Sequence, residues 1–424
     1  MGSFVCFVDL TAASSRSASE PICGSSSEWR CAHPAAANFA ACPSLKRRCK
    51  RVASSLVVCS LRQHDIKPAT PPLQLASRTS LRMGVPSKGR MAEDTMQLLK
   101  DCQLGLVKPN PRQYIASIAQ IPQLEVWFQR ATDVVRKLMY GDIDIGIVGY
   151  DMFEEICGGD PDLIVLHEAL NFGHCHLGLG VPMTGKFAGI NSLEDLRAMP
   201  EWTETNPLRV VTGYHQLARR FFAKHGFQHV VLLTADGALE AAPLMGSADI
   251  ILDLISTGIT LRENNLKQLE SAEVLRSQGV LVASRRALLE RPGLMEVVHE
   301  LLERLEAHLK ADGYYSVVAN MRGDSPEEVA SNIMSRGHLG GLQGPTISPV
   351  YTHGPGDNGS TDIIAQHGFY AATICVPKKL LYQSVKELRQ IGGSGVLVQP
   401  MTYIFDEEPV RWRRLLDTLE AAPK

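Results

Sequence analysis

The sequence predicts an α/β protein with two α/β units followed by a smaller four-stranded module. From residue 81 to residue 255, short apolar runs of strand length alternate with helical segments that have one apolar face. This alternation is typical of largely parallel sheets covered by helices. Beyond residue 311 the expected order becomes β-α-β-β-α-β, the order of a ferredoxin-like module. The chain of 424 residues is long enough for two or three domains with separate cores.

The composition is that of an ordinary globular protein and does not indicate a nucleic-acid or membrane partner. Hydrophobic residues make up 45% of the chain, charged residues 21%, and the formal net charge is -2. A charge so close to zero provides no general attraction to nucleic acid or to an anionic membrane surface. No apolar stretch approaches the roughly 20 residues that a membrane-spanning helix needs. We therefore expect neither partner.

Residues 1–77 differ from the rest of the chain and are expected to form a transit peptide and a linker. The segment is rich in Ser and Ala, contains few acids, and has a basic cluster at residues 46–51. These are features of an organelle transit peptide. We favour a plastid destination, with a mitochondrial one second and a nuclear signal at residues 46–51 as a further alternative. Pro68, Pro71 and Pro72 mark the linker.

The first α/β unit is expected to begin with a strand at residues 81–86 and a helix at residues 91–99. Ser87-Lys88-Gly89-Arg90 lies between these two elements. A helix N-terminus favours anions, and Lys88 and Arg90 would strengthen that preference. We interpret the segment as a phosphate-facing loop, and a solvated basic turn is the alternative.

Further strands of this unit are expected at residues 124–128 and 141–151. Between them lies a helix with an apolar face made of Val134, Val135, Leu138 and Met139. Glycines interrupt the second of these strands, which indicates that another group comes close to its backbone.

The second unit is expected to begin with a strand at residues 171–182 that leaves the first unit. His174 and His176 would share one face of that strand, but no further ligands with suitable spacing support a zinc site. The remaining strands are expected at residues 208–211, 230–233 and 249–255, the last of which would end the unit.

The segment Ile251–Leu261 carries the strongest functional signal. An apolar run that contains one carboxylate, Asp253, leads into a loop of small hydroxyl residues around Gly258. Such a loop at the carboxyl edge of a sheet presents backbone N–H groups and hydroxyls to a phosphate. Asp253 would then bind a sugar hydroxyl beside that phosphate. The segment therefore indicates a ribose-phosphate site, and an ordinary strand–turn–helix junction is the alternative.

The C-terminal module is expected to contain four strands and two helices. Few titratable groups cluster in it, so we do not expect catalysis there. The strands are expected at residues 314–320, 345–350, 369–376 and 395–400, and the helices at residues 326–335 and 378–390.

Five segments in order along the chain resemble the ATP phosphoribosyltransferases of histidine biosynthesis. They are Pro86–Met91, Gly141–Gly149, Asn171–Cys175, Gly237–Pro243 and Asp253–Asn264. The likeness continues through the C-terminal module, as in the long form of the enzyme, which carries its own regulatory domain.

The resemblance implies two catalytic domains of the periplasmic-binding-protein type and a ferredoxin-like (ACT-like) regulatory domain. Catalytic domain I would span residues 78–170 and be completed by residues 281–311. Catalytic domain II would span residues 171–280, the regulatory domain residues 312–405, and a C-terminal tail residues 406–424. The active site would lie in the cleft between the two catalytic domains.

The implied reaction joins N1 of the adenine of ATP to C1 of phosphoribosyl pyrophosphate and releases pyrophosphate. Adenine N1 is unprotonated at neutral pH, so no strong general base is needed. The enzyme must position the substrates and stabilise an oxocarbenium-like carbon and a departing pyrophosphate. Mg²⁺ would be carried by the substrate's pyrophosphate rather than by a protein metal cage.

Site roles are assigned from this chemistry and from the resemblance, with catalytic roles for Asp253, Thr257 and Arg90. The 5′-phosphate would be held by Ser256, Thr257, Gly258, Ile259 and Thr260, and the ribose by Asp253 with Glu240 as a further candidate. ATP or pyrophosphate would be bound by Lys88, Gly89, Arg90, Arg130 and Asn171. In the more familiar phosphoribosyltransferase fold the corresponding motif has two adjacent acids, whereas Leu254 follows Asp253 here.

The resemblance also implies a homo-hexamer inhibited by histidine, with AMP or ADP as candidate further ligands. The family's inhibitor positions align with Asp324, Leu342 and Gly393. The carboxylate of Asp324 would pair with the amino group or imidazole of histidine, and a helix N-cap before Ser325 is the alternative role. One departure is His176, which stands where family members often have Arg.

Two other functions remain compatible with the sequence. One is a phosphoribosyltransferase that acts on another base, which competition between acceptor substrates would distinguish. The other is a catalytically silent subunit or small-molecule sensor of the periplasmic-binding type. Histidine binding without turnover would favour that sensor.

Overall fold

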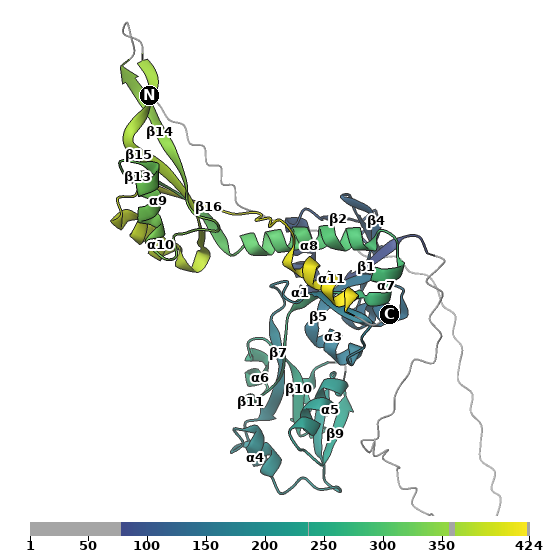
Figure 1. The fold of residues 1–424 in the computed structure, drawn as a ribbon. Coiled ribbons are helices and arrows are strands. Elements are labelled where there is room, and N and C mark those ends of the chain that lie inside the picture. Colours follow the sequence, from purple (N-terminus) through teal and green to yellow (C-terminus); the bar gives the residue numbers. More distant parts are fainter. Residues whose placement is uncertain (1–77, 236, 356–360, 422–424) are drawn as a thin grey trace, which may run out of the picture. The chain divides into compact units, whose positions relative to one another are not determined.

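The computed structural model describes residues 78–424, apart from residues 236, 356–360 and 422–424. The transit peptide predicted for residues 1–77 lies outside these residues. The described part of the chain contains a seven-stranded, a five-stranded and a four-stranded sheet (Figure 1). We call the units around the first two sheets lobe I and lobe II, and the unit around the third the C-terminal domain.

Lobe I is built on a sheet with the strand order β2-β3-β4-β1-β5-β12-β6. Its strands are β1 (Leu81–Pro86), β2 (Leu106–Val107), β3 (Ile115–Ile118), β4 (Ile121–Gln129), β5 (Ile145–Gly149), β6 (Leu163–His167) and β12 (Gly279–Ser284). Its helices are α1 (Arg90–Asp101), α2 (Ala131–Tyr140), α3 (Tyr150–Cys157), α7 (Arg285–Glu290) and α8 (Leu294–Ala311). β1 pairs in parallel with both β4 and β5, as the alternation of apolar runs and helices predicted.

Lobe II is built on a sheet with the strand order β11-β7-β10-β8-β9. Its strands are β7 (Cys175–Pro182), β8 (Leu208–Thr212), β9 (Val230–Thr234), β10 (Ile250–Ile255) and β11 (Leu266–Ser277). Its helical segments are η2 (Gly185–Phe187), α4 (Leu193–Ala198), α5 (His215–Lys224), η3 (Leu239–Ala241) and α6 (Ile259–Glu263). The prediction that β10 is the last strand of this unit is wrong, because β11 follows it and pairs with β7 at the edge of the sheet.

Each sheet contains one antiparallel strand that the chain delivers from the other lobe. β7 follows β6 of lobe I and pairs antiparallel with β10, and β12 follows β11 of lobe II and pairs antiparallel with β5. In both sheets the three strands that run parallel to one another have the order second, first, third in the chain. This exchange gives the two-lobed, periplasmic-binding-protein-like architecture that the resemblance implied. Because β12 begins at Gly279, the strand that returns to lobe I starts before the expected boundary at residue 280.

Continuous apolar runs explain why the central strands are buried on both faces. All five residues of β5 are buried. Gly146 in this strand allows α2 to approach closely, since a Cβ atom at that position would lie 2.6 Å from Cγ1 of Val134. A larger residue would push α2 away from the sheet.

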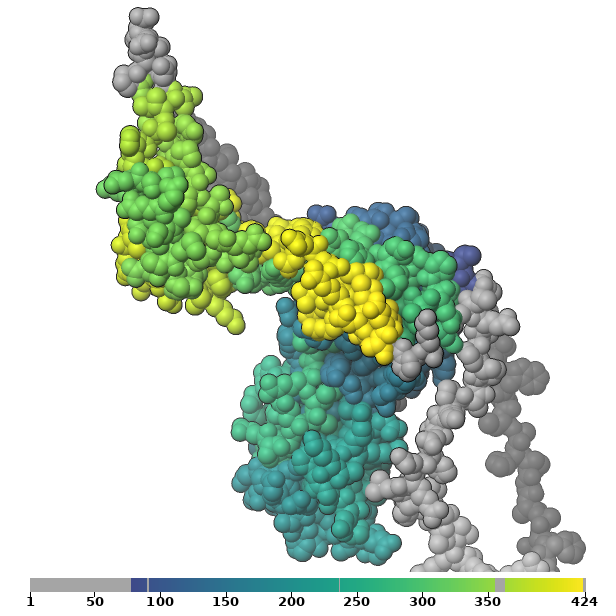
Figure 2. Space-filling view, viewed as in Figure 1, coloured from purple at the N-terminus to yellow at the C-terminus, as the bar shows by residue number. Residues whose placement is uncertain are grey.

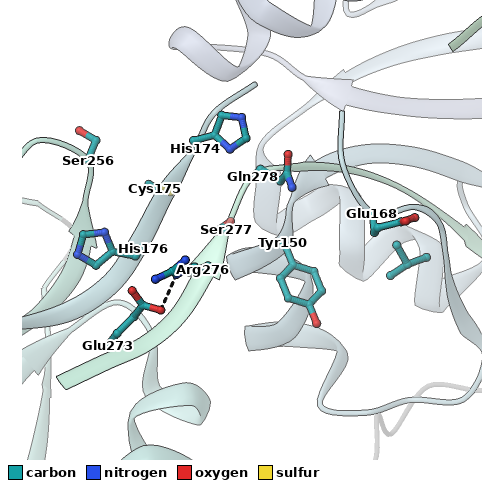
Figure 3. A pocket seen from close by; sticks show the side chains of 11 residues that line it. Tyr150, Glu168, His174, Cys175, His176, Ser256, Glu273, Arg276, Ser277 and Gln278 are labelled. Atoms are coloured by element: carbon teal, nitrogen blue, oxygen red, sulfur yellow. Dashed lines mark hydrogen bonds and ion pairs between the residues drawn. The ribbon is translucent and has the colours of Figure 1, made fainter. Parts of the chain in front are cut away.

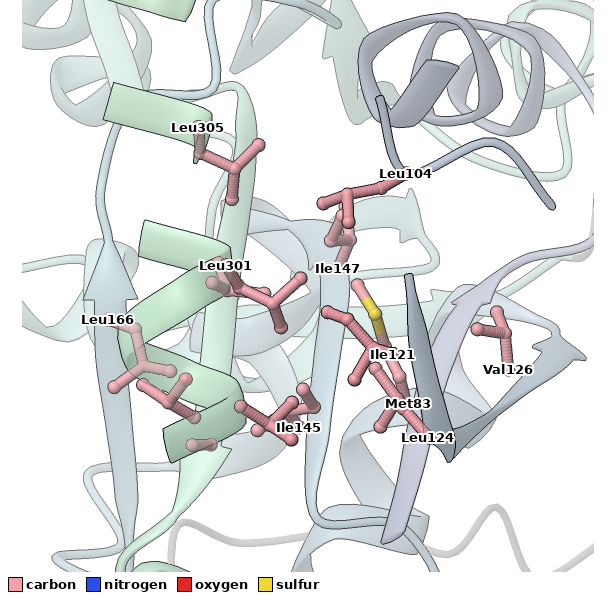
Figure 4. Close-up of a cluster of buried hydrophobic side chains, with 14 of the residues drawn as sticks. Met83, Leu104, Ile121, Leu124, Val126, Ile145, Ile147, Leu166, Leu301 and Leu305 are labelled. Atoms are coloured by element: carbon pink, nitrogen blue, oxygen red, sulfur yellow. The ribbon is translucent and has the colours of Figure 1, made fainter. Parts of the chain in front are cut away.

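The long helix α8 covers the lobe I sheet with a stripe of leucine and valine residues. Leu294, Val297, Leu301 and Leu305 repeat at three- and four-residue intervals and are fully or almost fully buried. Figure 4 shows Leu301 and Leu305 pointing toward the strand residues Ile145 and Ile147. α8 then leads directly into the C-terminal domain, whose first strand begins three residues after the helix ends.

The C-terminal domain has the predicted ferredoxin-like topology, with strand order β14-β15-β13-β16 and antiparallel pairing throughout. Its elements are β13 (Tyr314–Arg322), α9 (Pro326–Met334), β14 (Thr346–Pro355), β15 (Thr361–Pro377), η5 (Lys378–Leu380), α10 (Leu381–Gln390) and β16 (Ser394–Pro400). The segment expected to be a tail contains a further helix, α11 (Val410–Glu420). None of the described helices is long and apolar enough to cross a bilayer.

Each lobe has its own carboxylate just before its third parallel strand, and the two carboxylates make equivalent hydrogen bonds. In lobe I, Asp144 and Arg82 exchange two hydrogen bonds: Asp144 N donates to Arg82 O at 2.9 Å and Arg82 N donates to Asp144 Oδ2 at 2.8 Å. Asp249 and Arg209 make the same exchange in lobe II, at 2.8 and 3.0 Å. In both lobes the carboxylate therefore joins the first and third parallel strands at their amino ends.

Asp144 is the more deeply buried of these carboxylates and has two guanidinium partners. Nη2 of Arg78 and Nε of Arg291 each lie 2.7 Å from its Oδ1. The side chain of Asp144 is fully buried and that of Arg291 is 6% exposed. This group joins residues before β1, before β5 and before α8.

We predict that Asp144→Asn lowers the free energy of unfolding by about 3 kcal/mol, because it leaves two largely buried guanidinium groups without a negative partner. Chemical denaturation of the purified variant measures this change. Asp142→Asn is the matched control, since Asp142 only reaches Lys137 at 3.7 Å in a more exposed pair, and it should change stability by less than about 0.5 kcal/mol. Equal losses in the two variants would contradict the structural role of Asp144.

Candidate functional site

The predicted phosphate loop lies at the carboxyl end of β10, where three hydroxyl side chains are exposed. The loop follows Ile255 and leads into α6, and Gly258 has the left-handed backbone with φ of 67°. Ser256, Thr257 and Thr260 are exposed, so a ligand can reach their hydroxyls from solvent. The loop therefore combines exposed hydroxyls with a backbone turn that glycine favours.

Asp253 lies inside β10, two residues before the strand ends, as the strand expected at residues 249–255 placed it. Its Oδ1 accepts a hydrogen bond from Leu254 N at 2.8 Å. Burial raises the pKa of Asp253, the hydrogen bond from Leu254 opposes this shift, and the negative charge of Glu240 raises the pKa further. Glu240 belongs to η3, a separate segment of lobe II. A second acid therefore acts on Asp253, but it comes from a different element rather than from the next position in the motif.

The basic loop of lobe I lies at the carboxyl ends of two adjacent parallel strands. Ser87 N donates a hydrogen bond to Gln129 O at 2.8 Å. Lys88 and Arg130 are the next residues in the chain after these two bonded residues. The side chains of Lys88 and Arg130 are both exposed. Gly89 has a φ of 74° and directly precedes α1, as predicted for a strand-to-helix turn. The structure thus brings two predicted anion-binding cations to one sheet edge.

Asn171 lies in the connector between β6 and β7, which packs against the first turn of α1. Asn171 has a φ of 60°, and its N–H donates to Gln278 Oε1 at 3.3 Å. A Cβ atom at Gly173 would lie 2.5 Å from Sδ of Met91, so a side chain there would force the Met91 side chain to move. Close packing therefore holds the connector beside the predicted phosphate loop of lobe I.

A cavity of about 700 Å³ lies where the two connectors between the lobes meet (Figure 3). It is lined by Tyr150, Val165, Glu168, His174, Cys175, His176, Ser256, Glu273, Arg276, Ser277 and Gln278. Ser256 is the predicted substrate-binding residue in this lining. In Figure 3, Ser256 and His176 lie toward one end, while Tyr150 and Glu168 lie toward the other. The cavity therefore extends from the predicted phosphate loop to the connector that carries Asn171.

His176 already has a polar partner within lobe II. A ring nitrogen of His176 lies 2.6 Å from Nε2 of Gln268 on β11. The described residues contain no group of three or more His, Cys, Asp or Glu side chains placed to hold a metal ion. His176 is thus a cavity residue that Gln268 orients.

A buried carboxylate, Asp151, joins both lobes beside this cavity, and sequence reasoning did not identify it. The hydroxyl of Ser277 accepts a hydrogen bond from Asp151 N at 2.9 Å and donates to Asp151 Oδ1. Tyr214, at the start of α5, donates its hydroxyl to Asp151 Oδ2 at 2.9 Å. Burial and then the charge of Asp151 raise the pKa of Tyr214, and the charge of Asp253 raises it further. No sequence signal links these residues, because they lie on three distant segments.

The predicted inhibitor positions are only partly brought together in the described chain. Asp324 is exposed, and the N-cap of α9 is Ser325, which accepts from Glu328 N at 3.2 Å, so the cap role considered for Asp324 is wrong. Gly393 follows α10 and directly precedes β16, which pairs with β13. Leu342 follows Gly341, which packs on Cys375 of β15. Cys375 pairs with a residue near the start of β13, whereas Asp324 follows the other end of that strand. These two positions on β13 are six residues apart, which is about 20 Å.

Comparison with known proteins identifies two matching family models. The ATP phosphoribosyltransferase model (HisG) matches residues 130–307, and the HisG C-terminal domain model matches residues 311–403. The chain is 56% identical over 378 residues to ATP phosphoribosyltransferase 1, chloroplastic, of Arabidopsis thaliana, covering 88% of this chain and 90% of that protein. ATP phosphoribosyltransferase 2, chloroplastic, of the same plant is also 56% identical, over 375 residues.

A shorter bacterial relative matches part of the chain. The ATP phosphoribosyltransferase of Brucella melitensis is 36% identical over 234 residues, which are 99% of that protein and 54% of this chain. Among solved structures, the ATP phosphoribosyl transferase (HisG:HisZ) complex from Thermotoga maritima is 24% identical with a TM-score of 0.42, over 98% of that chain and 53% of this one. Given the identity to the plant relatives over most of both chains, the chain belongs to the ATP phosphoribosyltransferase family, whose enzymes catalyse the first step of histidine biosynthesis.

Proposed function

We propose that this chain transfers the phosphoribosyl group of phosphoribosyl pyrophosphate to N1 of ATP, with lobe II binding the phosphoribosyl group. The observation that carries this proposal is the half-buried carboxylate of Asp253 near the carboxyl end of β10, just before an exposed hydroxyl loop, with the charge of Glu240 acting on it. Ser256, Thr257, Gly258, Ile259 and Thr260 would hold the 5′-phosphate through their hydroxyls and backbone N–H groups. Asp253, together with Glu240, would accept hydrogen bonds from the ribose hydroxyls.

Lobe I would bind the nucleotide and the departing pyrophosphate. Lys88 and Arg130 are exposed cations at the carboxyl ends of adjacent strands, where anionic ligands of α/β sheets bind. Arg90 is the first residue of α1, directly after the positive-φ turn at Gly89. Asn171 would complete this side from the connector. Positive charge here would stabilise the pyrophosphate as its bond to C1 breaks.

The carboxylate of Asp253 would also stabilise the reacting sugar carbon. As the bond between C1 and the pyrophosphate lengthens, C1 gains positive character, and N1 of adenine supplies the electron pair of the new bond. No proton has to leave N1, so the chain needs no general base for this step. Its main contributions would be orientation of the two substrates and electrostatic stabilisation by Asp253 and by the cations of lobe I.

Mg²⁺ would enter the site with phosphoribosyl pyrophosphate. Mg²⁺ prefers oxygen ligands and keeps several waters, so one or two carboxylates and the substrate's phosphates suffice to bind it. The oxygens of Asp253 and Glu240 fit this requirement on the ribose side, since both are carboxylates and the charge of Glu240 acts on Asp253. The ion would neutralise negative charge on the pyrophosphate when bound.

We further propose a plastid enzyme that assembles as a homo-hexamer and is inhibited by histidine. The plastid address is supported by the chloroplastic plant relatives and by the composition of residues 1–77. Catalytic domains I and II would comprise residues 78–170 with 281–311 and residues 171–280, and the regulatory domain residues 312–405. Histidine would bind near Asp324 and Gly393, whereas Leu342 follows a glycine that packs near the opposite end of β13, and AMP or ADP would be further nucleotide ligands.

The reaction is tested by incubating the chain with ATP, phosphoribosyl pyrophosphate and Mg²⁺ under reducing conditions. We expect a phosphoribosyl-ATP adduct, and its absence would contradict the proposed function. Asp253→Asn should lower kcat/KM for phosphoribosyl pyrophosphate about a hundredfold, because the neutral amide cannot stabilise a positive sugar carbon.

Asp253→Asn should at the same time raise Tm near neutral pH. The raised pKa of Asp253 means that its ionised form costs folding free energy above that pKa, and this cost disappears as pH falls through it. The control is Glu263→Gln, an exposed acid on α6, which should change neither activity nor Tm. A lower Tm for Asp253→Asn would show that the carboxylate stabilises the fold.

Glu240→Gln should move the acid limb of the pH profile of kcat/KM for phosphoribosyl pyrophosphate to lower pH. Removing the negative charge of Glu240 lowers the pKa of Asp253, so Asp253 stays ionised in more acidic solution. Initial rates measured across the acid range in wild type and variant test the direction of the shift. An unchanged acid limb, or one displaced to higher pH, would exclude Asp253 as the group that titrates.

Histidine should inhibit without competing with ATP, and Asp324→Ala should relieve this inhibition while basal turnover stays nearly intact. The carboxylate of Asp324 is exposed and does not cap α9, so its removal should not disturb the helix. Glu327→Ala, an exposed acid in the first turn of α9, is the control and should keep normal inhibition. Equal loss of turnover and inhibition in Asp324→Ala would assign Asp324 to folding instead.

A further inference from the structure

After the C-terminal domain the chain returns to lobe I. After β16, Ile404 N donates to Ala307 O at 3.0 Å, so the returning segment runs beside α8. Helix α11 then packs Trp412, Leu415 and Leu419 into the lobe I core. Figure 2 shows this C-terminal segment, in yellow, lying on the surface of the green α7–α8 region. α11 lies beyond residue 403, where the matched family models end.

Arg411, in the first turn of α11, makes the most specific contacts of this helix. Its Nε and Nη2 lie 2.8 and 3.0 Å from the two carboxylate oxygens of Glu168, which is a bidentate arrangement. Its Nη1 lies 3.4 Å from Oε1 of Glu306 on α8, and its backbone N–H donates to the same oxygen at 3.1 Å. The side chain of Arg411 is only 22% exposed.

Arg411 stabilises the charged form of Glu168. Although partial burial opposes the shift, hydrogen bonds from Arg411 lower the pKa of Glu168 to about 2. The neighbouring His167 does not replace that partner, because burial and the charge of Arg411 lower its pKa to about 3. Arg414 reaches Glu168 only at 3.4 Å and is largely exposed. Arg411 is therefore the main partner of Glu168.

Glu168 is the first residue of the connector between β6 and β7, and it lines the cavity between the lobes. Farther along the connector, Leu170 N donates to Gly279 O at 3.0 Å and Gly279 N donates to Phe172 O at 2.9 Å. These bonds fix the middle of the connector to the start of β12. Its beginning is held by Arg411. Asn171 lies between Leu170 and Phe172, so the bonds to Gly279 flank it, and the ion pair with Arg411 anchors the connector three residues before it.

We propose that Arg411 is a positioning residue of the nucleotide site. Through Glu168 it fixes the connector that carries Asn171, and through Glu306 it joins that connector to α8, the helix that leads into the C-terminal domain. This inference rests on the proposed assignment of the connector side of the cavity to ATP. Phosphoribosyl pyrophosphate, assigned to the loop of lobe II, should be largely unaffected.

The test compares the full-length variants Arg411→Gln and Arg413→Gln with wild type. Arg413 lies on the same helix but pairs with Glu408 and is 65% exposed. We expect Arg411→Gln to raise KM for ATP about 3- to 10-fold, a change of the size expected for the loss of one partly exposed ion pair. The kcat and the KM for phosphoribosyl pyrophosphate should each change by less than about twofold. Arg413→Gln should resemble wild type, and Arg411→Lys should recover part of the loss.

A double-mutant cycle separates positioning from a general loss of structure. Glu168→Gln leaves α11 intact and should reproduce the KM change, and combining it with Arg411→Gln should add little further effect. Additive effects, an unchanged KM for ATP, or equal changes in kcat and both KM values would overturn the inference. If Arg411→Gln does not fold, the KM for ATP of Glu168→Gln alone tests the inference. If wild type itself forms no adduct, the proposed function fails instead.

Discussion

The arrangement of the two catalytic lobes depends on the hydrogen bonds that the buried carboxylate of Asp151 makes. It lies at the start of α3 in lobe I and accepts hydrogen bonds from Ser277, at the end of β11, and from Tyr214 in lobe II. Beside it, the carboxylate of Glu155 accepts the N–H groups of Gln216 and Leu217, both at 2.9 Å, and so caps α5 from the other lobe. A buried hydroxyl or carboxylate that loses its partner is costly, so these groups favour one relative placement of the lobes. The cavity and the acid of lobe II are arranged around that placement.

Asp144 and Asp253 show how differently the chain treats two carboxylates at opposite ends of equivalent strands. Asp144 precedes a central parallel strand and is enclosed by cations, which suits a group that stabilises the fold. Asp253 lies near the carboxyl end of the corresponding strand of lobe II, where burial and another acid disfavour its charge. A carboxylate kept in such surroundings is poised for a positively charged or hydroxyl-rich ligand rather than for stability.

The parts of the fold that could be predicted from the sequence are those encoded in local patterns. Buried parallel strands such as β1 and β5 appear as short apolar runs, and the turns at Gly89 and Gly258 appear as glycines between elements. β11 was missed because its burial alternates irregularly around bulges, so neither the strand period nor an apolar run is evident.

Only the parts of the site that are formed by residues adjacent in the sequence could be predicted from local patterns. The hydroxyl loop and the basic loop are read from neighbouring residues, whereas Glu240 was assigned to the ribose beside Asp253 only through the family resemblance, because its effect on Asp253 depends on how η3 folds onto β10. The same applies to Asp151, Ser277 and Tyr214, and to Arg411 with Glu168, whose partners lie far apart in the chain. Such contacts come from tertiary packing, for which a single sequence carries no local signal.

The exchange of β7 and β12 between the lobes also constrains the order in which the chain can fold. The lobe I sheet lacks its antiparallel strand β12 until the whole of lobe II has been synthesised, since β12 begins at Gly279. The partner of β5 in this pairing therefore lies more than a hundred residues later in the chain. Such a long-range pairing forms slowly. Until then, one edge of an apolar sheet stays uncovered in the growing chain. Lobe II, which receives β7 from sequence that precedes it, can close its own sheet first.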